Sequence, residues 1–141
     1  MGQDEIESIS QAVSLHNFIS NLPFKYDQEL NEGGEDISSG QRQLLSFARA
    51  LAYKPRILVL DEATSNVDLE TERQIQNGIK EMTRGRTSII IAHRLSTLMH
   101  VDKVLVLKQG EIIEFGSRKE LLQQKGVFYS LCQSQLHSEK S

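Results

Sequence analysis

The stretch KPRILVLDEATSNVDLE, residues 54–70, predicts the fold class of this protein. Its apolar run Ile57–Leu60 is short and unbroken, and it ends at two acids, Asp61 and Glu62. A run of this kind is typical of a strand that is buried on both faces of a sheet. Asp68 is a favourable N-cap for a helix that follows, with apolar residues at helical spacing. A buried strand followed by a helix indicates α/β architecture.

Two further segments extend this pattern toward the C-terminus. TSIIIAH, residues 87–93, predicts a second buried strand. KVLVLKQGEIIEFG, residues 103–116, predicts a hairpin with its turn at the Gln-Gly pair 109–110. Two short helices, roughly 119–124 and 127–135, are expected after it. Strands that alternate with helices favour a mostly parallel sheet with flanking helices and a C-terminal hairpin.

The first part of the chain does not follow this alternation. Asp4 is expected to cap one helix whose apolar positions repeat about every 3.6 residues until Pro23 stops it. Residues 24–36 are predicted to form a loop, and a second helix is expected from Ser38 to Lys54. We therefore predict a helical subdomain over residues 1–54, the sheet-containing core over residues 55–135 and a flexible tail over residues 136–141.

The composition argues against several classes of function. The formal net charge is −3 and the basic residues are scattered, so nucleic acid is not an expected partner. Cys132 is the single cysteine, which excludes an internal disulfide and a cysteine-rich metal site. The longest apolar runs have four residues, far short of the roughly 20 needed to cross a bilayer.

Candidate chemistry lies where the two predicted strands end. Ligands of an open α/β sheet gather at the carboxyl ends of its strands. Asp61 could hold Mg²⁺ there, and Glu62 could orient or deprotonate a water molecule, although two acids at a strand end can also be simply solvated. His93 follows the second strand. A lone histidine is more often structural, but His93 would emerge near the acids if the two strands are parallel neighbours.

The start of the second predicted helix is a further candidate site. Ser38 and Gln41 match a capping box, which needs no ligand. Gly40 is not explained by the box, because glycine in a first helical turn costs about 0.5–1 kcal/mol relative to alanine. A close approach of phosphate to the helix N-terminus would explain it. The segment SNVD, residues 65–68, can be a turn and an N-cap.

Three segments in order resemble the conserved motifs of ABC-type ATPases. ISSGQRQLLSFARAL resembles the signature motif, ILVLDEATSNVD resembles the Walker B motif with its D-loop, and TSIIIAHRLST resembles the H-loop. The resemblance runs from about residue 4 to residue 135. The third segment and the GEIIEFG hairpin resemble the exporter branch, in which the nucleotide-binding domain follows a membrane-spanning domain.

The resemblance implies a role for each matching residue. Asp61 would bind Mg²⁺ through water, Glu62 would be the general base for the attacking water, and His93 would contact the γ-phosphate. Ser65 and Asp68 would form the D-loop, which communicates across a dimer. The residues that would close over the γ-phosphate of ATP held by the opposite subunit are Ser38, Ser39, Gly40 and Gln41.

The sequence departs from the family pattern at two motifs. The signature is usually Leu-Ser-Gly-Gly-Gln, and here Ile37 and Ser39 replace its first and third residues. Ser39 adds a side chain where phosphate would come close. The altered signature, SNVD in place of the commoner Ser-Ala-Leu-Asp, and an intact Glu62 resemble one subunit of bacterial heterodimeric exporters of drugs or lipids. In those exporters one nucleotide site is weakened.

A larger departure is the lack of any G-x-x-x-x-G-K-[ST] motif in the sequence. The chain is therefore expected to be the C-terminal part of a P-loop NTPase domain of the ABC type, and inactive in isolation. The resemblance implies ATP and Mg²⁺ as cofactors. It also implies a second nucleotide-binding domain, in a heterodimer rather than a homodimer, and a transmembrane domain as partners at the cytoplasmic face of the membrane.

Two other interpretations remain open. A chromosome-maintenance or repair ATPase shares the signature and Walker B elements, but such proteins have long coiled-coil insertions, and the sequence has no heptad run. A non-catalytic fragment could complete the nucleotide site of a partner in trans.

Overall fold

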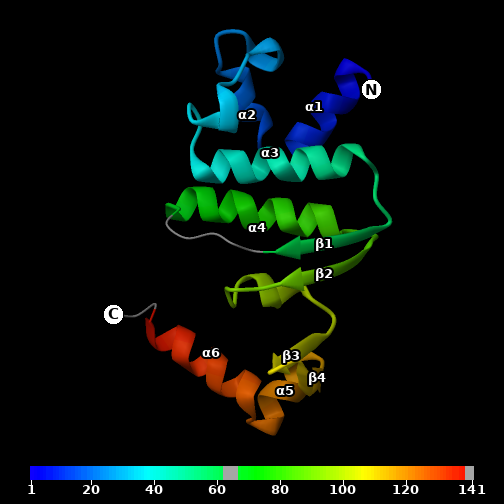
Figure 1. The fold of residues 1–141 in the computed structure, drawn as a ribbon, viewed down its shortest axis with the longest axis vertical. Helices are drawn as coiled ribbons and strands as arrows, with labels where there is room; N and C mark the ends of the chain where they lie inside the picture. Colours follow the sequence, from blue (N-terminus) through cyan, green and yellow to red (C-terminus); the bar gives the residue numbers. More distant parts are fainter. Residues whose placement is uncertain (62–66, 139–141) are drawn as a thin grey trace. The chain divides into compact units, whose positions relative to one another are not determined.

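The computed structural model of the chain describes residues 1–61 and 67–138 (Figure 1). Contacts divide the chain into two compact units, Met1–Ile91 and Ala92–Ser141, which are described separately. Within the described residues, no helix has the length and apolar character that a membrane span requires. The predicted division after residues 54 and 135 stays a prediction.

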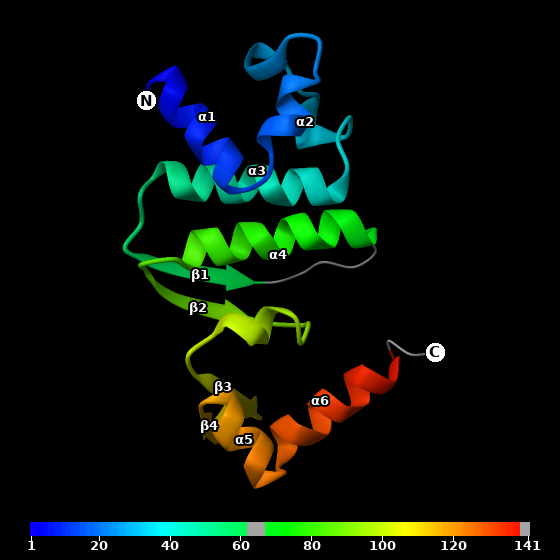
Figure 2. The same cartoon turned by 180° about the vertical axis from the view of Figure 1, so that it is seen from behind.

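The first unit stacks helices on a small parallel sheet. Both views place α4 between α3 and the two strands (Figures 1 and 2). Leu44 and Phe47 of α3 pack in one core cluster with Ile75 and Ile79 of α4 and with Leu58 of β1. The elements of this unit are α1 (Gln3–Ala12), α2 (His16–Ser20), α3 (Ser39–Ala52), β1 (Ile57–Asp61), α4 (Leu69–Thr83) and β2 (Thr87–Ile91), with 3-10 turns at Lys25–Asp27 and Glu32–Gly34.

Strands β1 and β2 pair in parallel, as predicted, with Ile57 opposite Thr87 and Asp61 opposite Ile91. The prediction that both faces of these strands are buried is wrong for the described chain. Leu58 is 6% exposed and faces the helices, whereas Val59 is 64% exposed. Successive side chains of a strand point to opposite faces, and α4 covers only one of them. The apolar strand residues exposed on the other face are Ile57, Val59, Ile89 and Ile91.

The single N-terminal helix that was predicted is two helices. The break lies at Ser14, which adopts a left-handed φ of 60°. The Ser14 amide donates to the Gln11 carbonyl and the Leu15 amide donates to the Ser10 carbonyl, the paired bonds of a Schellman motif. Apolar spacing alone does not reveal such a turn. The predicted cap at Asp4 is also wrong, because the helix begins at Gln3 and its N-cap position is Gly2, two residues before Asp4.

Helices α3 and α4 begin where the sequence predicts. Ser38 caps α3 in a complete capping box, and the Asp68 side chain caps α4. α3 ends at Ala52 rather than at Lys54, because Lys54 already has a φ of 49°. Pro55 could not have extended the helix in either case.

The second unit is a hairpin followed by two helices. Its elements are a 3-10 turn (Thr97–His100), β3 (Val104–Lys108), β4 (Glu111–Gly116), α5 (Arg118–Gln124) and α6 (Val127–Ser138). The hairpin turn at Gln109 and Gly110 is confirmed, with φ of 52° and 84°. Positive φ at both central residues matches the right-handed twist of the strands.

The core of the second unit is formed by Val104, Leu121, Phe128 and Cys132. Burial raises the pKa of the Cys132 thiol, so the thiolate is disfavoured and this cysteine serves as a small core residue. The α/β fold class is confirmed, with one parallel and one antiparallel strand pair among the described residues.

Candidate functional site

The N-terminal turn of α3 carries the predicted phosphate-facing residues. The Ser38 amide donates to Oε1 of Gln41 at 2.9 Å, and the Gln41 amide donates to Oγ of Ser38 at 3.1 Å. Ser38 and Ser39 are exposed, whereas Gly40 is buried. The capping box leaves the Ser39 side chain outside this pair of bonds, on the accessible side of the turn. The helix N-terminus itself is a favourable place for an anion.

Gly40 has a packing role that the sequence did not indicate. A Cβ atom at this position would overlap the methyl group of Thr71 at the start of α4. The Cβ of Thr71 and Cγ1 of Val67 would lie at 3.5 and 3.7 Å, which are ordinary contacts. The glycine therefore lets the first turns of α3 and α4 come together. Close approach of phosphate is no longer needed to explain why this residue is glycine.

Asp68 is engaged at the first turn of α4. Its Oδ1 accepts from the amides of Glu70 and Thr71 at 3.0 and 2.9 Å, and its Oδ2 accepts from the Thr71 hydroxyl at 2.6 Å. The Thr71 hydroxyl, helped by these amides, holds the pKa of Asp68 below its ordinary value. Asp68 is therefore a charged N-cap. Its predicted D-loop companion Ser65 lies outside the described residues.

Asp61 ends β1 at the edge of the sheet where β2 also ends. It is exposed and pairs in register with Ile91. Glu62, the predicted general base, lies outside the described residues. The described residues contain no group of three or more His, Cys, Asp or Glu side chains able to hold a metal. A single carboxylate fits Mg²⁺, which usually takes one or two carboxylates and keeps several waters.

His93 follows β2 by two residues and belongs to the second unit. It is exposed, and its backbone is held by a residue that the sequence analysis did not identify. Nε2 of Gln135 on α6 donates to the His93 carbonyl at 3.2 Å, and Oε1 of Gln135 accepts from the Leu95 amide at 3.1 Å. No periodicity or motif pairs residues so far apart in sequence.

Arg42 is a second residue that sequence reasoning missed. Its Nη1 donates to the carbonyls of Gly34 and Ile37 at 2.9 and 2.6 Å. Arg42 lies in the first turns of α3, so it ties the loop before the helix to the helix itself. The predicted loop 24–36 is thus held at its C-terminal end.

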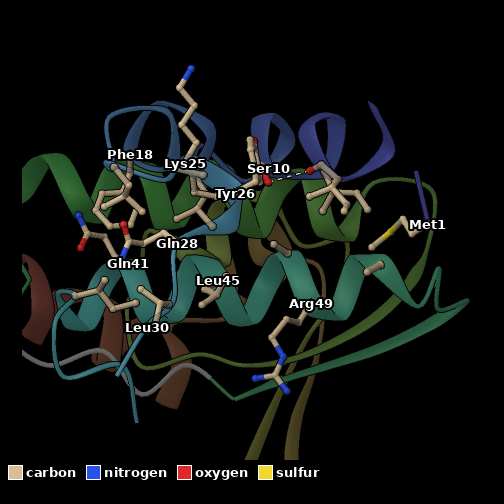
Figure 3. Close-up of a pocket in the computed structure, with 18 residues that line it drawn as sticks. Met1, Ser10, Phe18, Lys25, Tyr26, Gln28, Leu30, Gln41, Leu45 and Arg49 are labelled. Atoms are coloured by element: carbon tan, nitrogen blue, oxygen red, sulfur yellow. Dashed lines mark hydrogen bonds between the residues drawn. The ribbon is translucent and has the colours of Figure 1, made fainter. Parts of the chain in front are cut away.

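A cavity of about 270 Å³ lies among α1, α2 and α3 in the first unit (Figure 3). Its lining is mostly apolar and includes Phe18 and Leu45, while Gln41 and Gln28 add amide groups. Oε1 of Gln28 is buried without a hydrogen-bond partner. Among the candidate residues that the structure describes, Gln41 alone also lines this cavity.

The structure brings described candidate residues together in one place, and Asp61 and His93 lie elsewhere. The start of α3 contacts the start of α4 through Gly40 and Thr71. Asp61 lies at the paired ends of β1 and β2. His93 is in the other unit, where its backbone carbonyl accepts a hydrogen bond from Gln135.

Comparisons with known proteins agree on one family. Residues 2–65 match the family model described as "ABC transporter". The chain is 49% identical over 131 residues to the uncharacterized ABC transporter ATP-binding protein YfiC of Bacillus subtilis (strain 168), covering 93% of this chain and 22% of that protein. It is 44% identical to the ATP-dependent lipid A-core flippase of Syntrophus aciditrophicus (strain SB), covering 98% and 23%.

A solved structure is also similar. It is that of a bacterial Atm1-family ABC exporter with ATP bound, with a TM-score of 0.82 and 37% identity over 95% of this chain and 23% of that chain. The chain thus spans under a quarter of the length of each of these proteins. From the family match, the identities and the structural similarity, we conclude that the chain belongs to the ABC transporter family, as part of an ATP-binding domain.

Proposed function

We propose that this chain is part of an ABC exporter subunit that binds MgATP at an interface between two nucleotide-binding domains and couples its hydrolysis to export. The observation that supports this proposal best is the parallel register of β1 and β2. Asp61 pairs with Ile91, so β1 and β2 end together at one edge of the sheet, and Glu62 and His93 follow these two strands in the sequence. In α/β sheets this edge is the usual ligand site.

Asp61, Glu62 and His93 have separate roles in hydrolysis in this proposal. Asp61 would hold Mg²⁺, and the ion would supply positive charge that neutralises the phosphates. Glu62 accepts a proton from the attacking water. His93 donates a hydrogen bond to the γ-phosphate, where negative charge accumulates.

The N-terminal turn of α3 contacts ATP bound to the opposite subunit. Its N-terminal end and the hydroxyl of Ser38 face the γ-phosphate, as is favourable at a helix N-terminus. Ser39 is exposed on the same turn and adds bulk beside the phosphate. This bulk weakens the site that this signature completes. Ser65 and Asp68, as the D-loop, couple one nucleotide site of the dimer to the other.

The partners follow from this arrangement. The second nucleotide-binding domain belongs to a subunit of a different sequence, which makes the pair a heterodimer. A weakened nucleotide site is useful only beside a competent one. The chain lies at the cytoplasmic face of the membrane, where its partner is the transmembrane domain of the exporter. Relatives named as a lipid A-core flippase and as a putative multidrug export protein of Staphylococcus aureus support an amphipathic or lipid-like cargo.

The test is Glu62→Gln in the complete exporter. Hydrolysis should fall by at least about 100-fold while ATP binding persists and the two domains stay closed on ATP. Glu111→Gln is a matched control, because Glu111 is an exposed hairpin residue. Undiminished hydrolysis in Glu62→Gln would refute the role assigned to this residue.

A second candidate function is completion of a partner's nucleotide site in trans without catalysis by the chain. It is favoured by the capping box of α3, which is complete within this chain. The isolated chain is then expected to bind no ATP, because it has no Walker A sequence. Calorimetric titration of the chain with MgATP should give no binding heat, and saturable micromolar binding would contradict this expectation.

A further inference from the structure

The side chain of Gln135 joins α6 to the backbone just after β2. Its amide nitrogen donates to the His93 carbonyl at 3.2 Å and its amide oxygen accepts from the Leu95 amide at 3.1 Å. These groups lie 42 and 40 residues away in sequence, and all three residues belong to the second unit. Two bonds from one planar amide restrain both ends of the segment from His93 to Leu95.

The primary amide of glutamine can make both bonds at once. The His93 carbonyl requires a donor and the Leu95 amide requires an acceptor, and glutamine supplies one of each. An ionised glutamate would keep the acceptor but place a negative oxygen beside the His93 carbonyl. Leucine fills a similar space with neither group. Of glutamine, ionised glutamate and leucine, only glutamine therefore makes both bonds.

The helix that carries Gln135 is itself fixed at its start. Oε1 and Oε2 of Glu114 accept from the amides of Val127 and Phe128 at 2.6 and 2.9 Å. A Cβ at Gly126 would overlap the Glu114 carboxylate, so the helix start lies directly against β4. This contact anchors the N-terminal end of α6 to the hairpin.

Packing fixes the rotation of α6 about its axis. Phe128 and Cys132 are buried in the core of the second unit and are followed by Gln135 at i+7 and i+3 spacing. Residues at these spacings lie on one face of a helix. Leu95 packs against the same core. The position of α6 along its axis and its rotation are thus both restrained, and this places the Gln135 amide against residues 93–95.

We propose that Gln135 is a positioning residue for His93: it holds the backbone of residues 93–95 so that the His93 imidazole is presented to the nucleotide in a single orientation. This inference rests on the role of His93 in the proposed function. Gln135 itself contacts no substrate. Its loss lets the segment move, and displacements of about 1 Å can cost about 100-fold in rate.

The experiment uses the complete exporter with its partner subunit. Gln135→Leu and Gln135→Glu are compared with Gln133→Ala, an exposed control on the same helix. Hydrogen exchange of the peptide containing Leu95 should become faster by about tenfold at one amide in Gln135→Leu and should not change in the control. The kcat should fall about 10- to 100-fold in both Gln135 variants while KM changes less than about twofold.

A double-mutant cycle with His93→Ala separates positioning from general stability. Gln135→Leu should have no further effect on kcat in the His93→Ala background, since there is no imidazole left to position. A full additional loss in that background would overturn the proposal, as would unchanged Leu95 exchange in Gln135→Leu.

The two proposals fail in different ways. If His93→Ala hydrolyses ATP at the normal rate, the role of His93 in the proposed function is refuted, and the functional part of the Gln135 proposal falls with it. If His93→Ala is slow but Gln135→Leu has normal kcat, the proposed function stands and the Gln135 proposal is refuted.

Discussion

Replacing Gly40 with alanine should lower the free energy of unfolding by about 1–2 kcal/mol. The new Cβ would overlap the methyl group of Thr71. That methyl cannot simply rotate away, because the Thr71 hydroxyl donates to Asp68 Oδ2 at 2.6 Å. Overpacking of this kind costs about 1–3 kcal/mol, which outweighs the roughly 0.5–1 kcal/mol that alanine gains over glycine in a helix.

The structure also predicts a specific rescue. Thr71→Ser removes the methyl that clashes and keeps the hydroxyl that bonds Asp68, while the other neighbours of a Cβ at Gly40 lie at 3.5 and 3.7 Å. The double variant should therefore recover most of the loss, with a coupling energy of about 1–2 kcal/mol. Gly2→Ala is the control, because nothing lies within 4 Å of a Cβ there.

Urea unfolding followed by far-UV circular dichroism measures these differences. If Gly40→Ala is as stable as the parent protein, or if Thr71→Ser fails to restore it, the packing explanation of Gly40 is refuted. ATP hydrolysis by the stable variant Gly40→Ala/Thr71→Ser, measured in the complete exporter, then tests whether Gly40 also has a role beside the phosphate. A loss of turnover without a loss of stability would show that phosphate also requires a bare backbone at this position.

Three further predictions concern the helix ends. Glu114→Ala removes the acceptor for two amides at the start of α6 and should lower the thermal midpoint, with a loss of about 1–2 kcal/mol, whereas Glu111→Ala should have little effect. Ser14→Gly should raise the midpoint by relieving a φ of 60°, with a gain of about 0.5–1 kcal/mol, and an unchanged or lower midpoint would contradict this. The lowered pKa of Asp68 means that its stabilising contribution is present above the unfolded-state pKa and is lost as the pH falls through the folded-state pKa. The stability difference between the parent protein and Asp68→Asn should therefore shrink as the pH is lowered below about 4, and a constant difference in acid urea titrations would argue against it.

Local features were predictable because their causes are local. The capping box at Ser38, the cap at Asp68 and the hairpin turn at Gln109 all depend on residues within four positions of each other. Side chains of this kind satisfy nearby amides whatever surrounds them. The break at Ser14 is an instructive failure, because serine gives no indication of a left-handed turn and the apolar spacing continues across it.

Burial was less predictable than the strands themselves. The unbroken apolar runs predicted strands correctly, but not that Val59 and Ile89 would be exposed in the described chain. Exposure depends on which other segments are present to cover a sheet. Unbroken apolar runs are typical of strands whose sheet is covered on both faces.

By itself, the sequence determined the α/β class, the start points of α3 and α4, and the order of motifs that places the chain in its family. Those properties follow from side chains acting on their own backbone and from periodicity. Only the tertiary structure decided why residue 40 is glycine, and that Gln135 holds the backbone beside His93. Both depend on contacts between segments that are distant along the chain, and no spacing rule specifies which distant segments will meet.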